Sequence, residues 1–198
     1  MRVSRRLSST ATITTLMVGV FTLLAVAQAA ETPARQKVRI KNFGCINETF
    51  YRGAQPEKGD YEDLAAMGVK TIIDLQREGE AREQKMVEAA GMKFYRIPMS
   101  DNEPPAPEQV AEFLKLVNTP ANQPVFVHCK GGRHRTGAMI AVYRMTHDQW
   151  AADRAWQEMK QFDFEHGYGH GALKEYVFYY EKQMGHDKAV VVNTGSNK

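Results

Sequence analysis

The stretch Pro124-Val-Phe-Val-His-Cys-Lys-Gly-Gly-Arg-His-Arg-Thr-Gly137 decides the fold that we expect for this chain of 198 residues. Its first part, residues 124–128, is a short apolar run that predicts a buried strand. Two glycines follow, and a helix is predicted over residues 135–145. Ligands of open α/β sheets bind beyond the carboxyl ends of the strands. We therefore expect the loop between this strand and this helix to carry a binding or catalytic site.

Strand and helix patterns alternate along the rest of the chain. Further strands are predicted over residues 44–52 (a strand or hairpin closed by Gly53), 69–75, and 93–97, which ends at Pro98. Further helices are predicted over residues 61–67, 80–90, 108–117, 149–160 and 172–184. Strands separated by helices pair in parallel and are covered on both faces. The predicted fold class is α/β, with a central, mostly parallel sheet of about four or five strands flanked by helices.

The loop after residue 128 combines residue types that suit phosphate chemistry. Gly131 and Gly132 allow backbone angles that turn successive N–H groups toward one point, and the helix N-terminus adds its positive end. Arg135 can hold two phosphoryl oxygens through its planar guanidinium group. Cys129 would then lie beneath a bound phosphate, placed for attack. A lone cysteine is more often a small packed hydrophobe, but the Cys-x5-Arg-Thr-Gly spacing in this context favours the functional interpretation.

Three more basic side chains, Lys130, Arg133 and His134, lie in the same loop. If they point into solvent, they only tune solubility. If they face the phosphate, a substrate with several negative charges is favoured. The predicted phosphate-binding residues are Lys130, Gly131, Gly132, Arg133, His134 and Arg135.

The loop resembles the signature of the cysteine-based protein phosphatases, His-Cys-x5-Arg followed by Ser or Thr. The match is closest to the small, atypical dual-specificity branch found in bacteria, fungi and plants. Asn42-Phe43, Tyr51-Arg-Gly-Ala-Gln-Pro56 and Gly68-Val-Lys-Thr-Ile-Ile-Asp-Leu75 follow the order of that branch, so the resemblance covers roughly residues 42–164. It implies the dual-specificity phosphatase-like fold, with residues 42–186 as the phosphatase domain and 187–198 as a flexible tail.

The resemblance also implies a role for each residue of the signature. Cys129 is expected to form a phosphocysteine and Arg135 to bind the phosphate. Thr136 is expected to stabilise the thiolate as it leaves, and His128 to help keep the thiolate ionised through the hydrogen bonds of the loop. No metal and no other cofactor is implied, because Arg135 and the backbone amides offset the charge that magnesium offsets in kinases. The expected function is phosphoester hydrolysis of the protein-tyrosine or dual-specificity type.

The general acid is expected on the segment after the strand at 93–97. In the family it is an aspartate on a mobile loop, and Asp101 occupies that place here. The Trp-Pro-Asp form of the tyrosine-specific branch is absent, so the assignment rests on position, with Glu103 as the second candidate. Asp74 ends a strand on the same side of the sheet, and we predict a structural role for it.

Three alternatives can be compared with this expected function. The basic loop is similar to those of phosphoinositide and inositol-pyrophosphate phosphatases, so an inositol polyphosphate is an alternative substrate to phosphotyrosine, phosphoserine or small phosphoesters. A rhodanese-type sulfurtransferase is disfavoured, because its loop usually has four residues before the basic residue rather than five. A pseudophosphatase that binds phosphorylated ligands is disfavoured, because such proteins usually lose the cysteine, the arginine or the acid.

The N-terminus predicts export. Residues 1–10 carry three arginines and no acid, residues 16–27 are an apolar run, and Ala27-Gln28-Ala29 is a small-x-small cleavage pattern. A spanning helix needs about 20 apolar residues, so a cleaved signal peptide over residues 1–29 is favoured over a stable membrane anchor. Cleavage removes three of the 26 basic residues and none of the 23 acidic ones. The mature chain is then formally neutral, which argues against a nucleic-acid partner.

The remaining expectations concern organisation. After the signal peptide, residues 30–41 form a polar lead-in, and the protein is expected in the periplasm or secreted, as a monomer. Cys45 is expected to pack as a small hydrophobe, with a reversible disulfide to Cys129 as a hypothesis. His166 and His170 have a metal-like spacing, but the three glycines among residues 165–171 disfavour the helix that a metal site of this kind requires.

Overall fold

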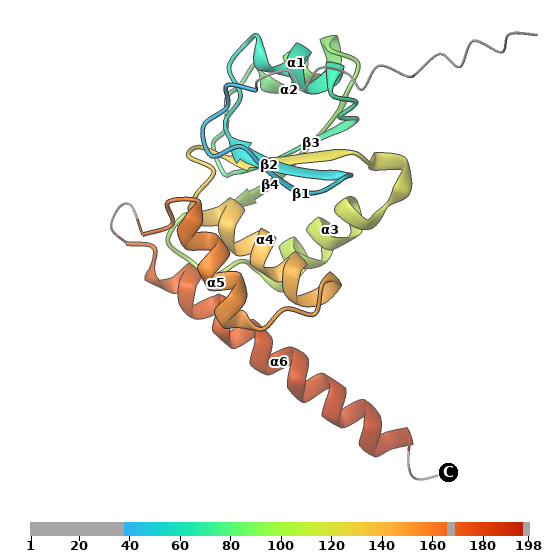
Figure 1. Cartoon of the computed structure of the whole chain (residues 1–198), viewed down its shortest axis with the longest axis vertical. Helices are drawn as coiled ribbons and strands as arrows, with labels where there is room; N and C mark the ends of the chain where they lie inside the picture. The colour runs from blue at the N-terminus through green and yellow to red at the C-terminus, as the bar shows by residue number, and fades with distance from the viewer. Residues whose placement is uncertain (1–37, 166–168, 196–198) are drawn as a thin grey trace, which may run out of the picture. The chain divides into compact units, whose positions relative to one another are not determined.

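The computed structural model describes residues 38–165 and 169–195 (Figure 1), all within one compact unit, Arg35–Lys198. The predicted signal peptide and most of the predicted lead-in lie outside the described residues. No helix among the described residues has the length and apolar character needed to cross a bilayer.

A five-stranded sheet forms the centre of this unit. The strands are β1 (Gly44–Asn47), β2 (Phe50–Ala54), β3 (Thr71–Gln76), β4 (Lys93–Met99) and β5 (Val125–Cys129). Their order across the sheet is β1-β2-β5-β3-β4; β1 pairs antiparallel with β2, and all other pairs are parallel. The predicted α/β class with a mostly parallel sheet is confirmed, and the region 44–52 is the hairpin β1–β2.

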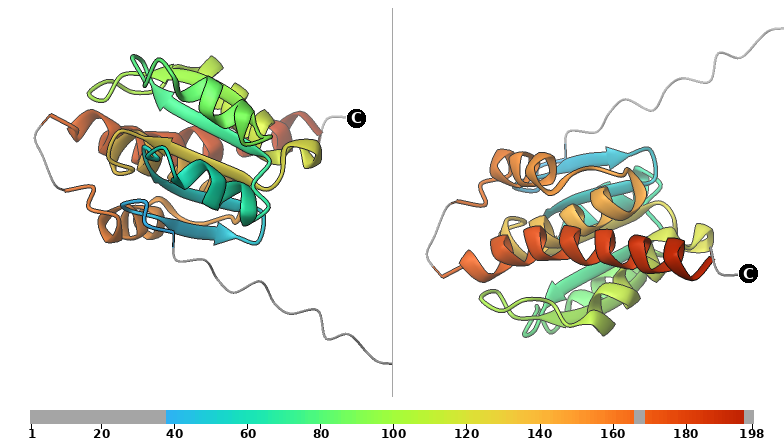
Figure 2. Two further views of the ribbon diagram at one scale, coloured as in Figure 1. Left: turned by 90° about the horizontal axis from the view of Figure 1, so that it is seen from above. Right: turned by 90° about the horizontal axis from the view of Figure 1, so that it is seen from below.

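Helices cover both faces of the sheet, as Figure 2 shows: α1 and α2 lie on one face, and α3, α4, α5 and α6 lie on the other. The helices are α1 (Asp60–Ala66), α2 (Glu83–Ala89), α3 (Pro107–Asn118), α4 (His134–His147), α5 (Ala152–Gln161) and α6 (Gly171–Gly195), with a 3-10 turn at Pro120–Asn122. Local chemistry sets their ends. Acidic residues occupy the first turn of α1, and Gly68, at φ +86°, follows it in the left-handed conformation. Gln109 accepts from the backbone N–H of Ala106 and so caps α3.

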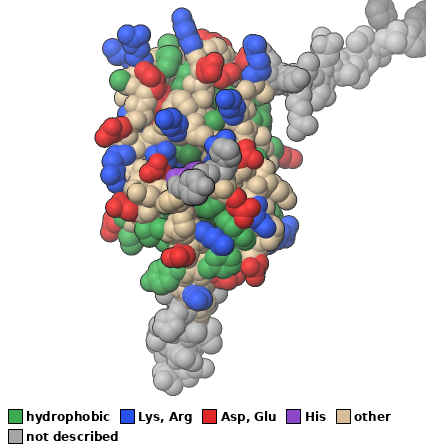
Figure 3. Space-filling model, turned by 90° about the vertical axis from the view of Figure 1, so that its left-hand side faces the viewer, with side chains coloured by type: hydrophobic (Ala, Val, Ile, Leu, Met, Phe, Trp, Pro, Cys, Tyr) green, Lys and Arg blue, Asp and Glu red, His purple; other side chains and the backbone are tan. Residues whose placement is uncertain are grey.

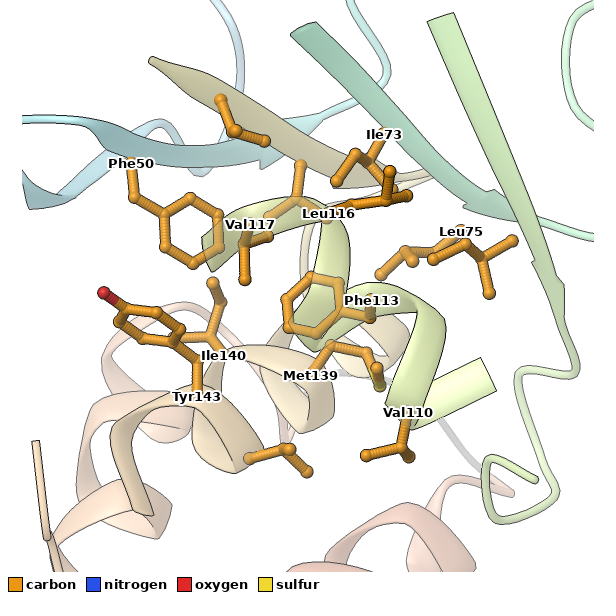
Figure 4. Close-up of a cluster of buried hydrophobic side chains, with 14 of the residues drawn as sticks. Phe50, Ile73, Leu75, Val110, Phe113, Leu116, Val117, Met139, Ile140 and Tyr143 are labelled. Atoms are coloured by element: carbon orange, nitrogen blue, oxygen red, sulfur yellow. The ribbon is translucent and has the colours of Figure 1, made fainter. Parts of the chain in front are cut away.

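The central strand β5 is buried along its whole length, because both of its faces pack against apolar side chains. On one face, Val125 and Val127 join Phe113 of α3 and Met139 of α4 in the cluster drawn in Figure 4. On the other face, Phe126 packs with the side chains of α1 and α2. The end of β5 is therefore held from both sides of the sheet.

Three expectations about local structure are wrong. The strand at 93–97 does not end at Pro98 but runs to Met99; β4 is an edge strand, so a missing N–H on its open side costs no sheet hydrogen bond. The spacing of Val110, Phe113, Leu114 and Val117 predicts that these four share the buried face of α3, but Leu116 is buried while Leu114 is only half-buried. The last helix extends to Gly195 rather than to residue 184, so its end includes most of the predicted tail.

Candidate active site

The nucleophile candidate is the last residue of β5. Cys129 is 3% exposed and pairs across the sheet with Ala54 of β2. The chain then makes a tight turn over residues 130–133 and enters α4 at His134. The thiol therefore lies at the carboxyl edge of the central strand, where the sequence predicts it.

Of the two loop glycines, only Gly132 occupies a position that a residue with a side chain could not take. Gly132 has φ +66°, and a Cβ atom there would lie 2.5 Å from the backbone carbon and oxygen of Gly53. Gly131 has no positive φ, and a Cβ there would meet only the Arg133 side chain, at 3.7 Å. The loop thus packs backbone to backbone against β2 at residue 132.

A cavity of about 270 Å³ opens at this end of the sheet. Its lining includes Arg135 from α4, Lys130 from the loop after β5, and Asp101 from the segment after β4. The complete lining is Gln76, Arg77, Glu78, Met99, Ser100, Asp101, Asn102, Lys130 and Arg135. A larger groove of about 730 Å³ between α3 and α6 is mostly apolar and involves none of the predicted site residues.

The predicted phosphate-binding residues separate into two groups. Lys130 and Arg135 border the cavity, and the Nε of Arg135 is buried with no hydrogen-bond partner among the described residues. Arg133 instead lies 3.9 Å from Asp163, and the ring of His134 contacts the carbonyl of Phe164 at 3.0 Å. The structure therefore brings Lys130 and Arg135 together at the cavity and directs Arg133 and His134 toward the segment after α5. Figure 3 views the molecule from this end and shows Lys and Arg side chains interspersed with acidic ones.

The two candidate acids differ in position. Asp101 lines the cavity, and its backbone oxygen contacts Nδ1 of His170 at 2.7 Å. The His170 ring stacks on that of His134, with 3.4 Å between centroids. Glu103 does not line the cavity and pairs with Arg77 at 3.4 Å on the surface. The geometry favours Asp101 and ties its segment to α4 through the two imidazoles; His166 lies outside the described residues.

We expect Asp101→Asn to lower kcat by about 10²–10³-fold for an alkyl phosphate, because the leaving oxygen then departs without a proton. With an activated aryl phosphate, whose leaving group needs no proton, the loss is expected to be much smaller. Glu103→Gln is the matched control, measured in the same phosphate-release assay. A larger loss in Glu103→Gln than in Asp101→Asn would show that the wrong carboxylate has been chosen.

The ring of His128 lies beside two carboxylates, and its predicted role in keeping the Cys129 thiolate ionised stays a prediction. Its Nε2 lies 2.9 Å from Oε1 of Glu83, and its Nδ1 lies 3.9 Å from Oδ1 of Asp74, with all three side chains fully buried. Arg96 donates to Oδ2 of Asp74 at 2.8 Å. Asp74 has the structural role predicted for it. The contacts with Glu83 of α2 and Asp74 of β3 therefore fix the orientation of the His128 ring.

No pattern in the sequence singles out Glu83, which lies in a polar helix near other acidic residues but is fully buried in the fold. Burial alone would raise the pKa of Glu83, but the contact with His128 and hydrogen bonds from Gln55 and Tyr61 outweigh it and hold that pKa below its usual value. Burial, together with the same carboxylate, raises the pKa of Tyr61 above its ordinary range. Glu83 is therefore ionised in the folded protein at neutral pH.

This lowered pKa predicts a stability difference that depends on pH. The stabilisation from ionised Glu83 is complete above its ordinary pKa of 4.5 and is lost as the pH falls through the lower folded-state value. Glu83→Gln should therefore have a lower Tm than the unmodified chain at pH 7, and the difference should shrink below about pH 4.5. Thermal unfolding of both proteins from pH 7 to pH 3 measures this. A Tm difference that stays constant over that range would contradict it.

Asp74, Glu83 and His128 are also the one group within the described residues whose ligand atoms lie close enough to hold a metal. Their atoms are already engaged, since Arg96 binds Asp74, and Glu83 accepts from Gln55 at 2.8 Å and from Tyr61 at 3.0 Å. We interpret the group as a hydrogen-bonded ionic network.

Thr136 and Cys45 complete the list of predicted residues. The Thr136 side chain is fully buried in the first turn of α4, and its hydroxyl has no hydrogen-bond partner among the described residues. Cys45 is exposed on β1 and does not pack as a small hydrophobe. Because β2 lies between β1 and β5, Cys45 and Cys129 are at least about 9–10 Å apart. A disulfide needs Cα atoms within about 7 Å, so the hypothesis of a bridge between them is wrong for this fold.

Comparison with known proteins finds a family that matches most of the chain. Residues 28–173 match the family described as "DSP-PTPase phosphatase fused to NAD+ Kinase". Among relatives, the inositol diphosphatase SIW14 of Saccharomyces cerevisiae is 29% identical over 130 residues, which are 63% of this chain and 46% of that protein. The "Probable tyrosine-protein phosphatase DG1060" of Dictyostelium discoideum is 28% identical over 126 residues, 61% of this chain and 75% of that protein. The chain thus spans about half the length of the yeast relative.

A solved structure extends the comparison to three dimensions. The core catalytic domain of the yeast PP-IP phosphatase SIW14, in complex with citrate, superimposes with a TM-score of 0.64 at 25% identity. The superposition covers 78% of this chain and 94% of that domain. The fold and the order of its elements are therefore shared across nearly the whole of that domain.

Proposed function

Since this chain belongs to the DSP-PTPase family, within the atypical dual-specificity cysteine phosphatases, we propose that it hydrolyses phosphate esters through a phosphocysteine on Cys129. The observation that carries the proposal is the convergence of Lys130, Arg135 and Asp101 on one cavity at the end of the strand that delivers Cys129. A guanidinium group, an ammonium group and a carboxylate from three separate segments meet there, directly beyond the strand end that carries Cys129.

In the first step, the Cys129 thiolate attacks phosphorus. An S–P bond forms, the bond between phosphorus and the leaving oxygen breaks, and Asp101 gives its proton to that oxygen. Arg135 and the loop N–H groups bind the phosphoryl oxygens on which negative charge is spread in the transition state. The products of this step are the free alcohol or phenol and phosphocysteine.

In the second step, water replaces the thiolate. The Asp101 carboxylate takes a proton from the water as its oxygen bonds to phosphorus, the S–P bond breaks, and inorganic phosphate and the thiolate are released. The buried hydroxyl of Thr136 is the group that stabilises the departing thiolate. The His128 ring, fixed by Glu83, orients the backbone at the end of β5.

Phosphate release by the reduced chain beginning at Ala30 tests the proposal, with a phosphotyrosine peptide and an inositol polyphosphate compared and Cys129→Ser as the blank. Release that is lost in the variant supports the cysteine mechanism. No release from either substrate, with tight binding of the esters retained, would instead make this a phospho-ligand-binding protein.

An inositol polyphosphate is the second candidate substrate. Lys130 and Arg77 border the cavity together with Arg135, so cations are available for phosphates beyond the one that is attacked. The name of the yeast relative points the same way. Preference for the inositol polyphosphate over the phosphotyrosine peptide in kcat/KM would decide for this candidate.

We infer that the protein is exported and acts as a monomer in the periplasm or outside the cell. The arginine-rich start, the apolar run and the cleavage pattern of residues 1–29 support export. Mass spectrometry of the chain isolated from the producing cell should find an N-terminus at Ala30, and light scattering should find the mass of one chain. An intact N-terminus on cytoplasmic protein would contradict export.

A further inference from the structure

Three consecutive carbonyl groups of the loop accept hydrogen bonds from one side. The oxygen of Lys130 accepts from the backbone N–H of Gln55 at 3.4 Å, and that of Gly131 accepts from Nδ2 of Asn42 at 2.8 Å. The oxygen of Gly132 accepts from Nη2 of Arg52. All three donors come from the segment 42–55: Asn42 lies before β2, Arg52 lies on it and Gln55 directly follows it, and β2 adjoins β5. We call Asn42, Arg52 and Gln55 the carbonyl clamp.

Peptide geometry gives this arrangement a consequence for the opposite side of the loop. In a trans peptide, the C=O of one residue and the N–H of the next point in opposite directions. Carbonyls of residues 130–132 that face the clamp therefore turn the N–H groups of residues 131–133 away from it. These are the N–H groups that a phosphate bound above Cys129 would use.

The donors of the clamp are themselves fixed. Arg52 is 0% exposed, and its guanidinium carbon lies 3.9 Å over the ring of Phe162. Burial lowers its pKa to about 10, a shift that Glu158 and Cys129 oppose, so the side chain is charged at neutral pH. Asn42 has φ +52°, a conformation that asparagine tolerates better than most residues. Gln55 is held in turn by its side-chain bonds to Gln76 and Glu83.

Close packing between β2 and the loop fixes the position of the carbonyl clamp relative to the loop. A Cβ atom on Gly53 would lie 2.8 Å from the Phe126 ring and 2.9 Å from Ile40, so β2 tolerates no side chain at this point. Gly132 packs on the backbone of this same residue. This backbone contact fixes the position of Arg52 relative to the carbonyl of Gly132, to which it donates.

We propose that Asn42 and Arg52 are positioning residues of the phosphatase reaction, which hold the loop with its N–H groups already aimed at the phosphoryl oxygens. This inference rests on the proposed function and extends it to the Asn42 and Tyr-Arg-Gly-Ala-Gln-Pro segments, whose part in the reaction the signature loop leaves open. The donors act through the loop backbone rather than by touching the substrate. Their loss should weaken binding of inorganic phosphate as well as turnover, since both depend on the same N–H groups.

The test compares three variants for inorganic phosphate affinity, by calorimetry, and for kcat and KM. Asn42→Gly removes the donor while keeping the left-handed backbone unstrained, and we expect about tenfold weaker phosphate binding and a similar fall in kcat. Arg52→Met should lose about a hundredfold in both, and Arg52→Lys, which keeps the charge, should recover part of the loss. Asn47→Ala is the matched control, because Asn47 also donates from Nδ2, but to the Tyr143 hydroxyl, at 2.9 Å.

Thermal unfolding without ligand identifies any variant that fails to fold; if Arg52→Met does, Asn42→Gly and Arg52→Lys decide the matter. The inference holds if Asn42→Gly weakens phosphate binding and turnover while Asn47→Ala lowers Tm but leaves phosphate affinity unchanged. It is overturned if Asn42→Gly binds phosphate and turns over substrate within twofold of the unmodified chain. If the unmodified chain neither binds phosphate nor releases it from esters, the proposed function fails, and this inference fails with it.

Discussion

Replacing Cys129 by serine should abolish turnover, with a loss of at least about 10⁴-fold in kcat. A serine hydroxyl is a much weaker nucleophile than a cysteine sulfur, so the attack on phosphorus loses its nucleophile. The fold should not change, because Ser and Cys are nearly equal in size and Cys129 makes its contacts from the end of a strand that is held on both faces. Phosphate release under single-turnover conditions measures the loss.

Cys45→Ser is the matched control for this variant. Cys45 is exposed on β1, and its Sγ donates a hydrogen bond to the carbonyl of Asn47 at 3.1 Å. Its replacement should leave kcat and KM unchanged. A Cys129→Ser protein that still forms phosphate at more than about a hundredth of the original rate would refute the phosphocysteine mechanism.

Replacing Arg135 by lysine should lower kcat by about 10²–10³-fold. The guanidinium group can donate two parallel hydrogen bonds to the equatorial oxygens of a phosphoryl group, whereas an ammonium group is a point charge on a flexible stem. Arg135 borders the cavity from the first turn of α4, and its Nε is buried and without a partner among the described residues. Lysine keeps the positive charge, so the loss in kcat measures the contribution of the two parallel hydrogen bonds from the guanidinium group.

Arg133 offers a control of the same residue type two positions away. Arg133→Lys keeps a cation within reach of Asp163, outside the cavity, and should change kcat/KM by less than about threefold. Equal losses of kcat/KM in Arg135→Lys and Arg133→Lys would contradict this. They would mean that any arginine near the loop contributes equally, rather than the guanidinium group of Arg135 in the cavity.

The sequence predicts the framework of this fold well, because that framework depends on local apolar runs. The strand at 124–128 and the helix after it are found in place, and so is the hairpin near residue 44. What local patterns cannot predict is the consequence of sheet order. Pro98 ends a strand only if a neighbour needs its N–H, and β4 has no neighbour on that side. α6 runs on to Gly195 through Gly185 and three consecutive valines, residues of low helix propensity, so the local sequence predicts an earlier end.

The same distinction applies to the site. Cys129, Arg135 and Asp101 could be predicted because spacing within one loop, or position after one strand, identifies them. Glu83 and Arg52 could not be assigned roles, because their roles depend on contacts with residues far along the chain. Glu83 contacts His128, 45 positions later, and Arg52 binds the carbonyl of Gly132, 80 positions later. In the sequence, each looks like an ordinary surface charge; in the fold, each is fully buried against the backbone or the ring that it orients.

The helix that carries Arg135 has a covering that bears on how the protein is made. Nine of its fourteen residues are buried, and Ala138, Ala141 and Met145 are covered by α5 and by Leu173 and Val177 of α6. During synthesis, α4 leaves the ribosome before α6 does, so this part of its surface lacks its cover until α6 has been made. A chain that stops before Leu173 carries every residue of the signature, but it lacks this cover on the helix that anchors the phosphate loop.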